Sequence, residues 1–282
     1  MNTITGDKHL LNLGCGRRYH GDWTNVDFHS TGKGVIAHNL LKGIPFKDNT
    51  FDMVYHSHII EHFPKEEAPK FLGECYRVLK QNGILRVAFP DLEQMVSHYT
   101  RLLRELKNGD TRHEADYDWI MLELYDQTVR NVSGGEMFRY FVRESIPNES
   151  FVLERCGVEA KNLIAAGKKR FSETLARGRG GDKGVREMVK RLKRKLSRPA
   201  AALLGGDSLA ARIGKFRLGG EIHQWMYDSF SLGRLLGMTG FKQIMVRDPF
   251  TSCLKGWKEY NLDTEPDGTV YKPESAYIEA IK

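Results

Sequence analysis

The chain has 282 residues and a net charge of +7, with 40% hydrophobic and 10% aromatic residues. This length and composition allow one large domain, or one domain with an insertion, and argue against global disorder. No run approaches the roughly 18 apolar residues of a membrane-spanning helix, and we see no secretion signal. The four scattered cysteines, at neither metal-ligand nor disulfide spacing, predict reduced thiols in a cytoplasmic protein.

The first predicted element is an apolar strand at 9–13 that leads into Gly14 and Gly16, with Asp27 eleven positions after the second glycine. The spacing indicates a strand, a tight turn, a helix and a second strand that ends in a carboxylate. Glycines at such a turn let the backbone approach a bound cofactor, and a carboxylate can accept hydrogen bonds from ribose hydroxyls. The same turn also fits a nicotinamide dinucleotide.

Strands and helices alternate through residues 8–100. We expect a helix over 67–79, closed by Asn82-Gly83, and strands at 25–28, 34–38, 51–55 and 84–89. The alternation predicts an α/β fold, a Rossmann-like doubly wound parallel sheet with helices on both faces. Its ligand site is expected beyond the carboxyl ends of the strands.

Residues 101–220 read as a largely helical, basic insertion. Between 161 and 217 the chain has 17 Lys or Arg residues against 4 Asp or Glu residues. A predicted helix at 186–196 carries an apolar face surrounded by cations. Such a helix fits an anionic membrane surface, which would place the protein at the inner face of the membrane, and it equally fits a solvated surface helix. Nucleic acid is less favoured because the stretch has few aromatic residues.

Residues 221–282 return to the pattern of the core. We expect a helix at 227–239 and strands at 242–246 and 276–281. The predicted organisation is a cofactor-binding part of the core at 1–100, the basic insertion at 101–220, and a C-terminal part of the core sheet at 221–282.

Four motifs in order resemble the class I S-adenosylmethionine-dependent methyltransferases, at 11–16, 44–54, 59–62 and 74–85. The C-terminal segments at 223–228 and 262–268 are similar to a bacterial subgroup associated with polysaccharide and glycan biosynthesis. The resemblance implies a Rossmann-like methyltransferase fold with S-adenosyl-L-methionine as cofactor. It covers 8–100 and 221–282 and says little about the insertion.

The resemblance also implies which residues contact the cofactor: Asn12, Gly14, Cys15, Gly16, Asp27, Phe28, Asn39, Leu40, His56 and Ser57. Asp27 would bind the ribose, Asn39 the adenine amino group, and Leu40 would pack on the adenine. Asn12, where the pattern usually has an acidic residue, and Arg17-Arg18, where small residues often follow, depart from the family. Asp27 and Asn39 also suit purely structural turn roles.

Residues 58–62, His-Ile-Ile-Glu-His, match the inverted zinc-protease pattern H-x-x-E-H. A zinc site needs a third protein ligand and a long helix, and Pro64 limits any helix here. The sulfonium donor that the resemblance implies already carries an activated methyl group. We therefore expect no metal and predict that this turn lines the acceptor pocket.

Transfer to a hydroxyl group requires a general base, for which histidine is suited at neutral pH. The candidates are His58, His62 and His223, with Glu61 orienting one of them; Tyr227 and Asp91 are lesser candidates. The leading hypothesis is O-methylation of a sugar or glycan-linked acceptor. The alternatives are another small metabolite such as a quinone precursor or antibiotic intermediate, RNA, and a non-catalytic adenosine-binding adaptor.

Overall fold

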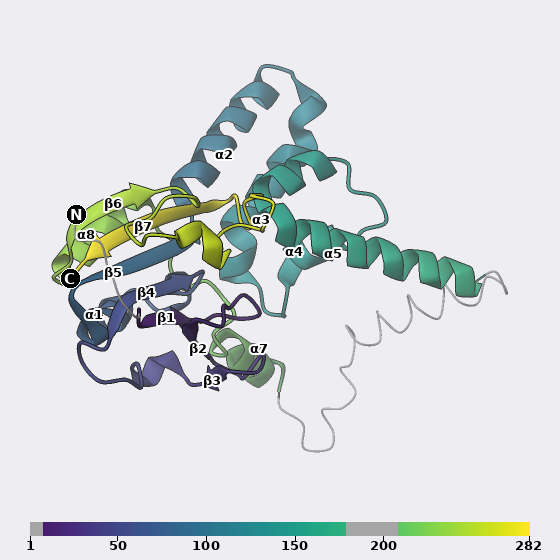
Figure 1. Ribbon diagram of the computed structural model, residues 1–282. Helices are drawn as coiled ribbons and strands as arrows, with labels where there is room; N and C mark the ends of the chain where they lie inside the picture. Colours follow the sequence, from purple (N-terminus) through teal and green to yellow (C-terminus); the bar gives the residue numbers. More distant parts are fainter. Residues whose placement is uncertain (1–7, 179–207) are drawn as a thin grey trace.

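The computed structural model describes residues 8–178 and 208–282. A seven-stranded sheet in the order β3-β2-β1-β4-β5-β7-β6 runs through the molecule (Figure 1). Its strands are β1 Leu10–Leu13, β2 Trp23–Asp27, β3 Val35–Ala37, β4 Phe51–Ser57, β5 Leu79–Pro90, β6 Lys242–Arg247 and β7 Ser275–Ile281. This confirms the predicted Rossmann-like α/β architecture.

The prediction of an all-parallel sheet was wrong at one edge. Strands β1 to β5 are parallel, whereas β7 runs antiparallel to both β5 and β6. The segment 248–274 does not carry the chain back across the sheet, so β7 begins at the edge where β5 ends, with Ser275 opposite Pro90. A parallel strand would require a return crossover, usually a helix.

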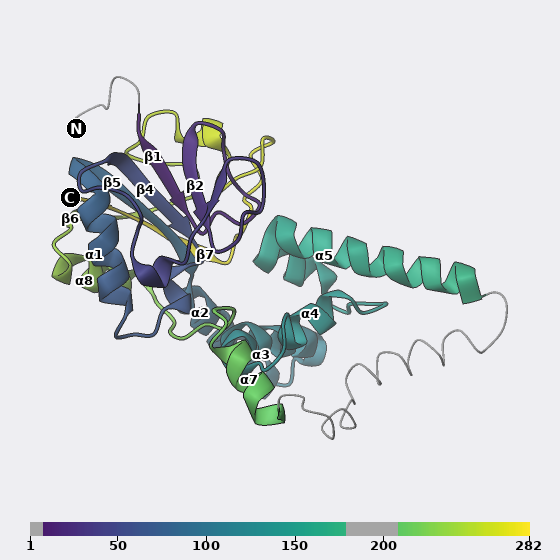
Figure 2. The same ribbon diagram turned by 90° about the horizontal axis from the view of Figure 1, so that it is seen from below.

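Helices α1 (Ala68–Val78) and α8 (Ser229–Met238) cover one face of the sheet (Figure 2). In α1, the buried residues Phe71, Leu72, Cys75 and Val78 recur at helical spacing and face the strands. They form the main apolar core with side chains of β1, β4, β5 and β7. This face is held mostly by burial of apolar surface.

The opposite face is covered by the irregular segment 248–274, not by the helices that we predicted. Leu254, Trp257 and Leu262 of this segment pack on Trp23 and Tyr55 of the sheet. The helix expected after the glycine turn is also absent, because residues 14–22 form turns between β1 and β2. A connection of nine residues that includes two glycines in left-handed conformations leaves little room for a helix.

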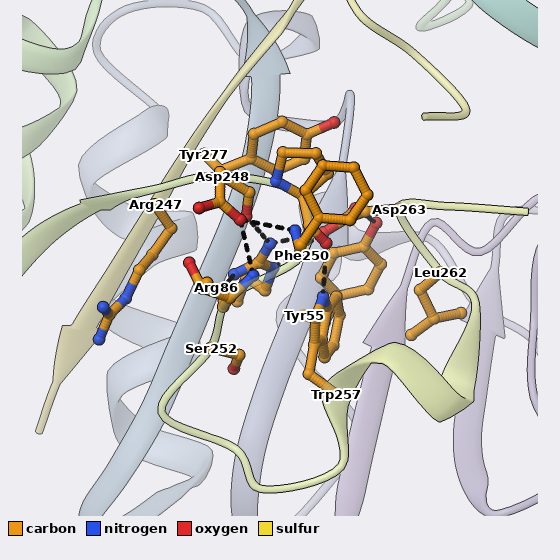
Figure 3. A network of polar contacts seen from close by, with 12 residues as sticks. Tyr55, Arg86, Arg247, Asp248, Phe250, Ser252, Trp257, Leu262, Asp263 and Tyr277 are labelled. Atoms are coloured by element: carbon orange, nitrogen blue, oxygen red, sulfur yellow. Dashed lines mark hydrogen bonds and ion pairs between the residues drawn. The ribbon is translucent and has the colours of Figure 1, made fainter. Parts of the chain in front are cut away.

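A buried arginine of the sheet binds the irregular segment 248–274 (Figure 3). Arg86 of β5 has a fully buried side chain that forms ion pairs with Asp263 at 2.8 Å and with Glu279 at 3.1 Å. Its guanidinium group also donates to the carbonyl oxygens of Asp248 and Thr251 and lies 4.4 Å from the centre of the Trp257 ring. One side chain thus satisfies carbonyls that an irregular segment would otherwise bury without partners.

Asn82-Gly83 does not close the preceding helix. Helix α1 ends at Val78, and Asn82 and Gly83 lie within β5. Asn82 has φ 64°, and the pairing of β4 with β5 shifts register in this region. A Cβ on Gly83 would approach the Lys80 carbonyl oxygen to 2.8 Å. The glycine therefore permits an irregularity in the strand instead of a helix cap.

Four helices after β5 form a second apolar core beside the sheet: α2 Leu92–Lys107, α3 Glu114–Val129, α4 Gly135–Phe141 and α5 Glu149–Gly178. The predicted boundary at residue 100 falls inside α2. Helix α5 kinks at Gly157 (φ 56°), where a Cβ would overlap Pro273. The kink therefore places the insertion directly against the C-terminal segment.

Short elements complete the described chain: α7 Leu209–Arg217 and the 3-10 turns η1 Leu40–Lys42, η2 Ile60–His62, η3 Thr111–His113 and η5 Trp257–Tyr260. The predicted amphipathic helix at 186–196 lies outside the described residues. Within the described ranges, no helix combines the length and the apolar character needed to cross a bilayer.

Candidate functional site

The glycine loop lies at the carboxyl end of β1, where β1 has β2 on one side and β4 on the other. Gly14 and Gly16 have φ values of 62° and 54°, which favour glycine. A Cβ on Gly14 would overlap the Ile59 side chain, whereas one on Gly16 would meet no atom within 4 Å. The first glycine is thus required by packing inside the protein, and the second leaves backbone open to a ligand.

Two side chains hold the glycine loop in place. The amide nitrogen of Asn12 donates to the Arg18 carbonyl oxygen at 3.1 Å and to Asn25 Oδ1 at 3.2 Å. The Gly16 N–H donates to Asp27 Oδ2 at 2.8 Å. Both residues therefore have structural roles that are compatible with the predicted cofactor contacts, which stay predictions.

Arg18, a departure from the family pattern, connects the glycine loop to the C-terminal segment. It donates to the Leu262 carbonyl oxygen at 2.8 Å, pairs with Glu265 at 2.9 Å, and lies 3.9 Å from the centre of the Tyr271 ring. These contacts close one side of the site. The small residue typical of the family could not make them.

A cleft of about 520 Å³ opens beside this loop. It is lined by eight residues that the sequence predicted for the site: Asn12, Gly14, Cys15, Gly16, Ser57, His58, His62 and His223. Leu262, Tyr271 and Lys272 of the C-terminal segment form its opposite wall. Its volume is within the ~300–1,000 Å³ typical of small-molecule sites.

The other predicted cofactor residues do not line this cleft, and these include Asp27, which reaches it only through its hydrogen bond to the Gly16 N–H. Phe28 is 59% exposed, Leu40 packs against the core, and Asn39 caps η1 by accepting from the Leu41 N–H at 3.0 Å. His56 is fully buried against Phe71, on the face covered by α1, and burial lowers the pKa of its imidazole to about 3. Alternation along β4 directs His56 away from Tyr55 and Ser57, so only its backbone is near the cleft.

A second, smaller pocket of about 290 Å³ adjoins the cleft and shares His58, Gln127, Arg130, Glu159, Glu221 and Lys272 with it. Four apolar residues line part of this pocket: Met95 of α2, and Met137, Phe138 and Phe141 of α4. Glu274 lies at its base, where burial raises the pKa of the carboxyl group to about 7. The core and the insertion thus build this pocket together.

His58 lies where the two pockets meet. It has φ 52°, an uncommon conformation for a residue with a side chain, and its Nε2 is 2.8 Å from Ser275 Oγ. Burial, reinforced by Lys272, holds the pKa of its imidazole well below the usual value. The ring is therefore neutral at pH 7, and the same burial disfavours its protonated form.

Glu61, His62 and His223 gather beside His58. Glu61 Oε1 is 3.5 Å from His58 Nδ1 and 3.9 Å from His223 Nε2. Burial raises the pKa of Glu61 to about 8 and lowers that of His223 well below its usual value. The H-x-x-E-H segment forms the short turn η2 and not a long helix, so its two histidines do not share a helix face.

Two comparisons with known proteins concern the sheet. Residues 21–87 match the family model described as a methyltransferase domain. The probable methyltransferase ltbC of Aspergillus luteorubrus is 46% identical over 111 residues, which cover 35% of this chain. The chain spans 38% of the length of that relative. The matched residues 21–87 hold β2, β3, β4 and most of β5, so this part of the sheet is similar to a methyltransferase domain.

Solved structures that resemble the chain include two S-adenosylmethionine-dependent methyltransferases. The possible histamine N-methyltransferase of Thermotoga maritima is 12% identical, with a TM-score of 0.38, and the match covers 99% of this chain and 84% of that one. An enzyme of Archaeoglobus fulgidus is 12% identical, with a TM-score of 0.37, over 98% of this chain and 86% of that one.

The cleft fits S-adenosylmethionine, on which the two enzymes of known structure named above depend. The open backbone at Gly16 and the Asp27 carboxylate beside it are groups suited to hold the methionine and ribose parts. The cofactor supplies a methyl group already activated on a sulfonium. A protein that binds this cofactor for methyl transfer must therefore hold the acceptor in line and accept its proton.

Sequence reasoning missed several residues of the methyltransferase site: Gln127, Arg130, Glu159, Glu221, Tyr271 and Lys272. They come from α3, α5 and loops of the insertion and the C-terminal segment. No spacing in the chain links them, because only the packing of α3 and α5 against the sheet brings them together. The one local indication was that most of these residues are charged, which suits the wall of a polar pocket.

Proposed function

We propose that this protein is an S-adenosylmethionine-dependent methyltransferase that methylates a hydroxyl group of a small, hydroxyl-rich acceptor, such as a sugar or a glycan-linked sugar unit. The observation that carries the proposal is the pair of adjoining pockets that meet at His58. The larger one, beside the glycine loop, serves the donor. The smaller one serves the acceptor.

The lining of the acceptor pocket supports a hydroxyl-rich ligand. Gln127, Ser133 and Arg130 can donate hydrogen bonds, while Glu123 and Glu221 can accept them. A hydroxyl group both donates and accepts, so a sugar matches such a mixed wall. The volume of about 290 Å³ favours one sugar unit or a metabolite of similar size.

In this proposal His58 is the general base. It lines both pockets, and its neutral imidazole can take the hydroxyl proton as the acceptor oxygen attacks the methyl carbon. The hydrogen bond to Ser275 fixes the ring orientation. A strained backbone at such a residue is typical of functional sites.

The test combines the wild-type chain with His58→Ala and a matched control, His113→Ala, at a surface histidine far from the pockets. With methyl-labelled donor and a panel of sugars, nucleotide sugars and phenols, mass spectrometry should detect methylation of a sugar hydroxyl. We expect His58→Ala to lower kcat by about 10²–10⁴-fold with unchanged donor affinity. Equal kcat values for both variants would contradict the role of His58.

A second acceptor class has its own support. Phe138, Phe141, Met95 and Met137 give one end of the pocket an apolar, partly aromatic surface. This surface suits an aromatic metabolite such as a quinone precursor or antibiotic intermediate. Transfer to phenols alone in the same panel would replace the sugar proposal with this one.

A further inference from the structure

The tertiary structure brings three metal-ligating side chains together beside the donor cleft. Glu61 and His62 come from η2, and His223 comes from the segment before α8. One ligand atom from each lies within 4.8 Å of the others. We propose that these three residues form a binding site for a divalent transition-metal ion, with Zn²⁺ as the best match to two imidazoles and one carboxylate.

The unsatisfied polar atoms at this place support the proposal. Glu61 is 1% exposed, and neither of its carboxylate oxygens has a hydrogen-bond partner. His223 is 4% exposed, and its Nδ1 also lacks a partner. Buried polar atoms nearly always have partners. A bound cation would satisfy the Glu61 carboxylate, while His223 would bind it through Nε2 and keep its proton on Nδ1.

His62 is oriented as metal-binding histidines usually are. Its Nδ1 is 3.1 Å from the Ile222 carbonyl oxygen, so this nitrogen carries the proton and donates. Its Nε2 is then left with a free lone pair. In known metal sites the non-ligating nitrogen of a histidine commonly donates to a backbone carbonyl in this way, which fixes the tautomer.

Backbone hydrogen bonds hold the third ligand against η2. The Gln224 N–H donates to the Glu61 carbonyl oxygen at 2.7 Å, and the His223 N–H donates to the Gln127 carbonyl oxygen at 2.9 Å. Glu61 Oε1 and His223 Nε2 are 3.9 Å apart, too far for a hydrogen bond. Two ligands of a tetrahedral zinc ion are roughly 3.3 Å apart, and the three ligand atoms lie within 4.8 Å of one another, so these separations would have to shorten by up to about 1.5 Å.

The nearby cations already have partners. Arg130 pairs with Glu221 at 3.2 Å, and Lys272 pairs with Glu159 at 3.1 Å. Two further titratable groups face the cluster: His58, whose Nδ1 is 3.5 Å from Glu61 Oε1, and the buried Tyr227 hydroxyl, which interacts electrostatically with Glu61. The local charge therefore does not exclude a bound cation.

Three protein ligands leave an open position, as in catalytic zinc sites. His62 and His223 line the donor cleft, so this position is accessible from the site. If the proposed function holds, an acceptor hydroxyl could bind there, and the ion would lower the pKa of that hydroxyl. The existence of the site does not depend on that role.

The experiment measures metal binding directly, without donor or acceptor. The full chain is stripped with a chelator, loaded with Zn²⁺, passed through a desalting column and analysed by mass spectrometry for bound metal. We expect one ion per chain. Glu61→Gln, His62→Ala and His223→Ala should each weaken Zn²⁺ binding by roughly 10- to 100-fold or more. Loading with Co²⁺ should give the visible absorption of a tetrahedral site.

His113→Ala is the matched control, because His113 also lies near two carboxylates, Glu105 and Asp116, but at the surface. It should retain one ion. Circular dichroism checks the folding of each variant. If a variant does not fold, the Co²⁺ spectrum of the unchanged chain tests the site instead. No stoichiometric ion and no tetrahedral Co²⁺ spectrum in the full chain would overturn the site. Methylation by chelated, metal-free protein would then still support the proposed function.

Discussion

The two faces of the sheet are covered by different means. On one face, α1 and α8 bury an apolar core. On the other, the irregular segment 248–274 packs a few aromatic residues and depends on the buried ions Arg86, Asp263 and Glu279 (Figure 3). Helices satisfy their own backbone groups, whereas an irregular cover needs side chains to do so.

The two faces also differ in what they contribute to the candidate site. The irregular segment also contributes Leu262, Tyr271 and Lys272 to the donor cleft, while α1 and α8 contribute no residue to either pocket. The helical face therefore serves stability. The other face serves both stability and the site, and substitutions on the two faces should separate these effects.

The largest effect is expected at Arg86. Arg86→Met leaves Asp263 buried without its cation and Glu279 paired with Arg247 alone, which should lower the free energy of unfolding by about 3–5 kcal/mol. Urea denaturation followed by circular dichroism measures the change. A loss below about 1 kcal/mol would mean that the buried network does not hold the irregular cover.

The second-largest loss of stability is expected from a cavity on the face that α1 and α8 cover. Leu72 of α1 is fully buried against the sheet, and Leu72→Ala should cost about 2–5 kcal/mol of unfolding free energy. Because the side chain is remote from the cleft, the folded variant should bind S-adenosylmethionine as tightly as the wild type. Calorimetric titration checks this, and weakened binding would break the proposed separation of the faces.

Loss of the Asp27 carboxylate tests the site directly. Asp27→Ala should weaken S-adenosylmethionine binding by about 1–3 kcal/mol, because it removes charge-assisted hydrogen bonds and the partner of the Gly16 N–H. Calorimetric titration measures the change. Asp22→Ala is the control, because the Asp22 side chain is 74% exposed. Equal affinity in both variants would show that Asp27 has only its turn role.

The pH dependence of stability should report on His56, on the helical face. Its pKa is about 3 in the folded chain and 6.5 ordinarily, so the unfolded state binds the proton first as the pH falls. Stability is therefore full above pH 6.5 and is lost progressively toward pH 3. Between pH 6.5 and 5 the loss should be about 1.5–2 kcal/mol. His56→Leu should lack this component, and identical pH profiles in urea denaturation would contradict it.

The success of prediction from the sequence differs between these regions. Alternating apolar strands and the helical spacing of Phe71, Leu72, Cys75 and Val78 sufficed to predict the sheet and α1, since both patterns are local. Gly14 and Gly16 likewise predicted a ligand site at the end of β1, where the cleft opens; their contacts with a cofactor stay predictions, as does that of Asp27. The antiparallel β7, the missing helix after the glycine turn and the position of Asn82 were mispredicted, because long-range pairing overrides local signals.

The amino-acid sequence by itself determined the α/β class, the methyltransferase motifs and the turn that carries the donor cleft, because these depend on neighbours along the chain. Only the tertiary structure decided which distant residues pack against these elements. It brings His223 to Glu61 and His62 from more than 160 positions away, places Arg86 under segment 248–274, and lines the smaller pocket with residues of α3, α4 and α5. Such contacts arise from burial between distant segments, which leaves no periodic pattern in the chain.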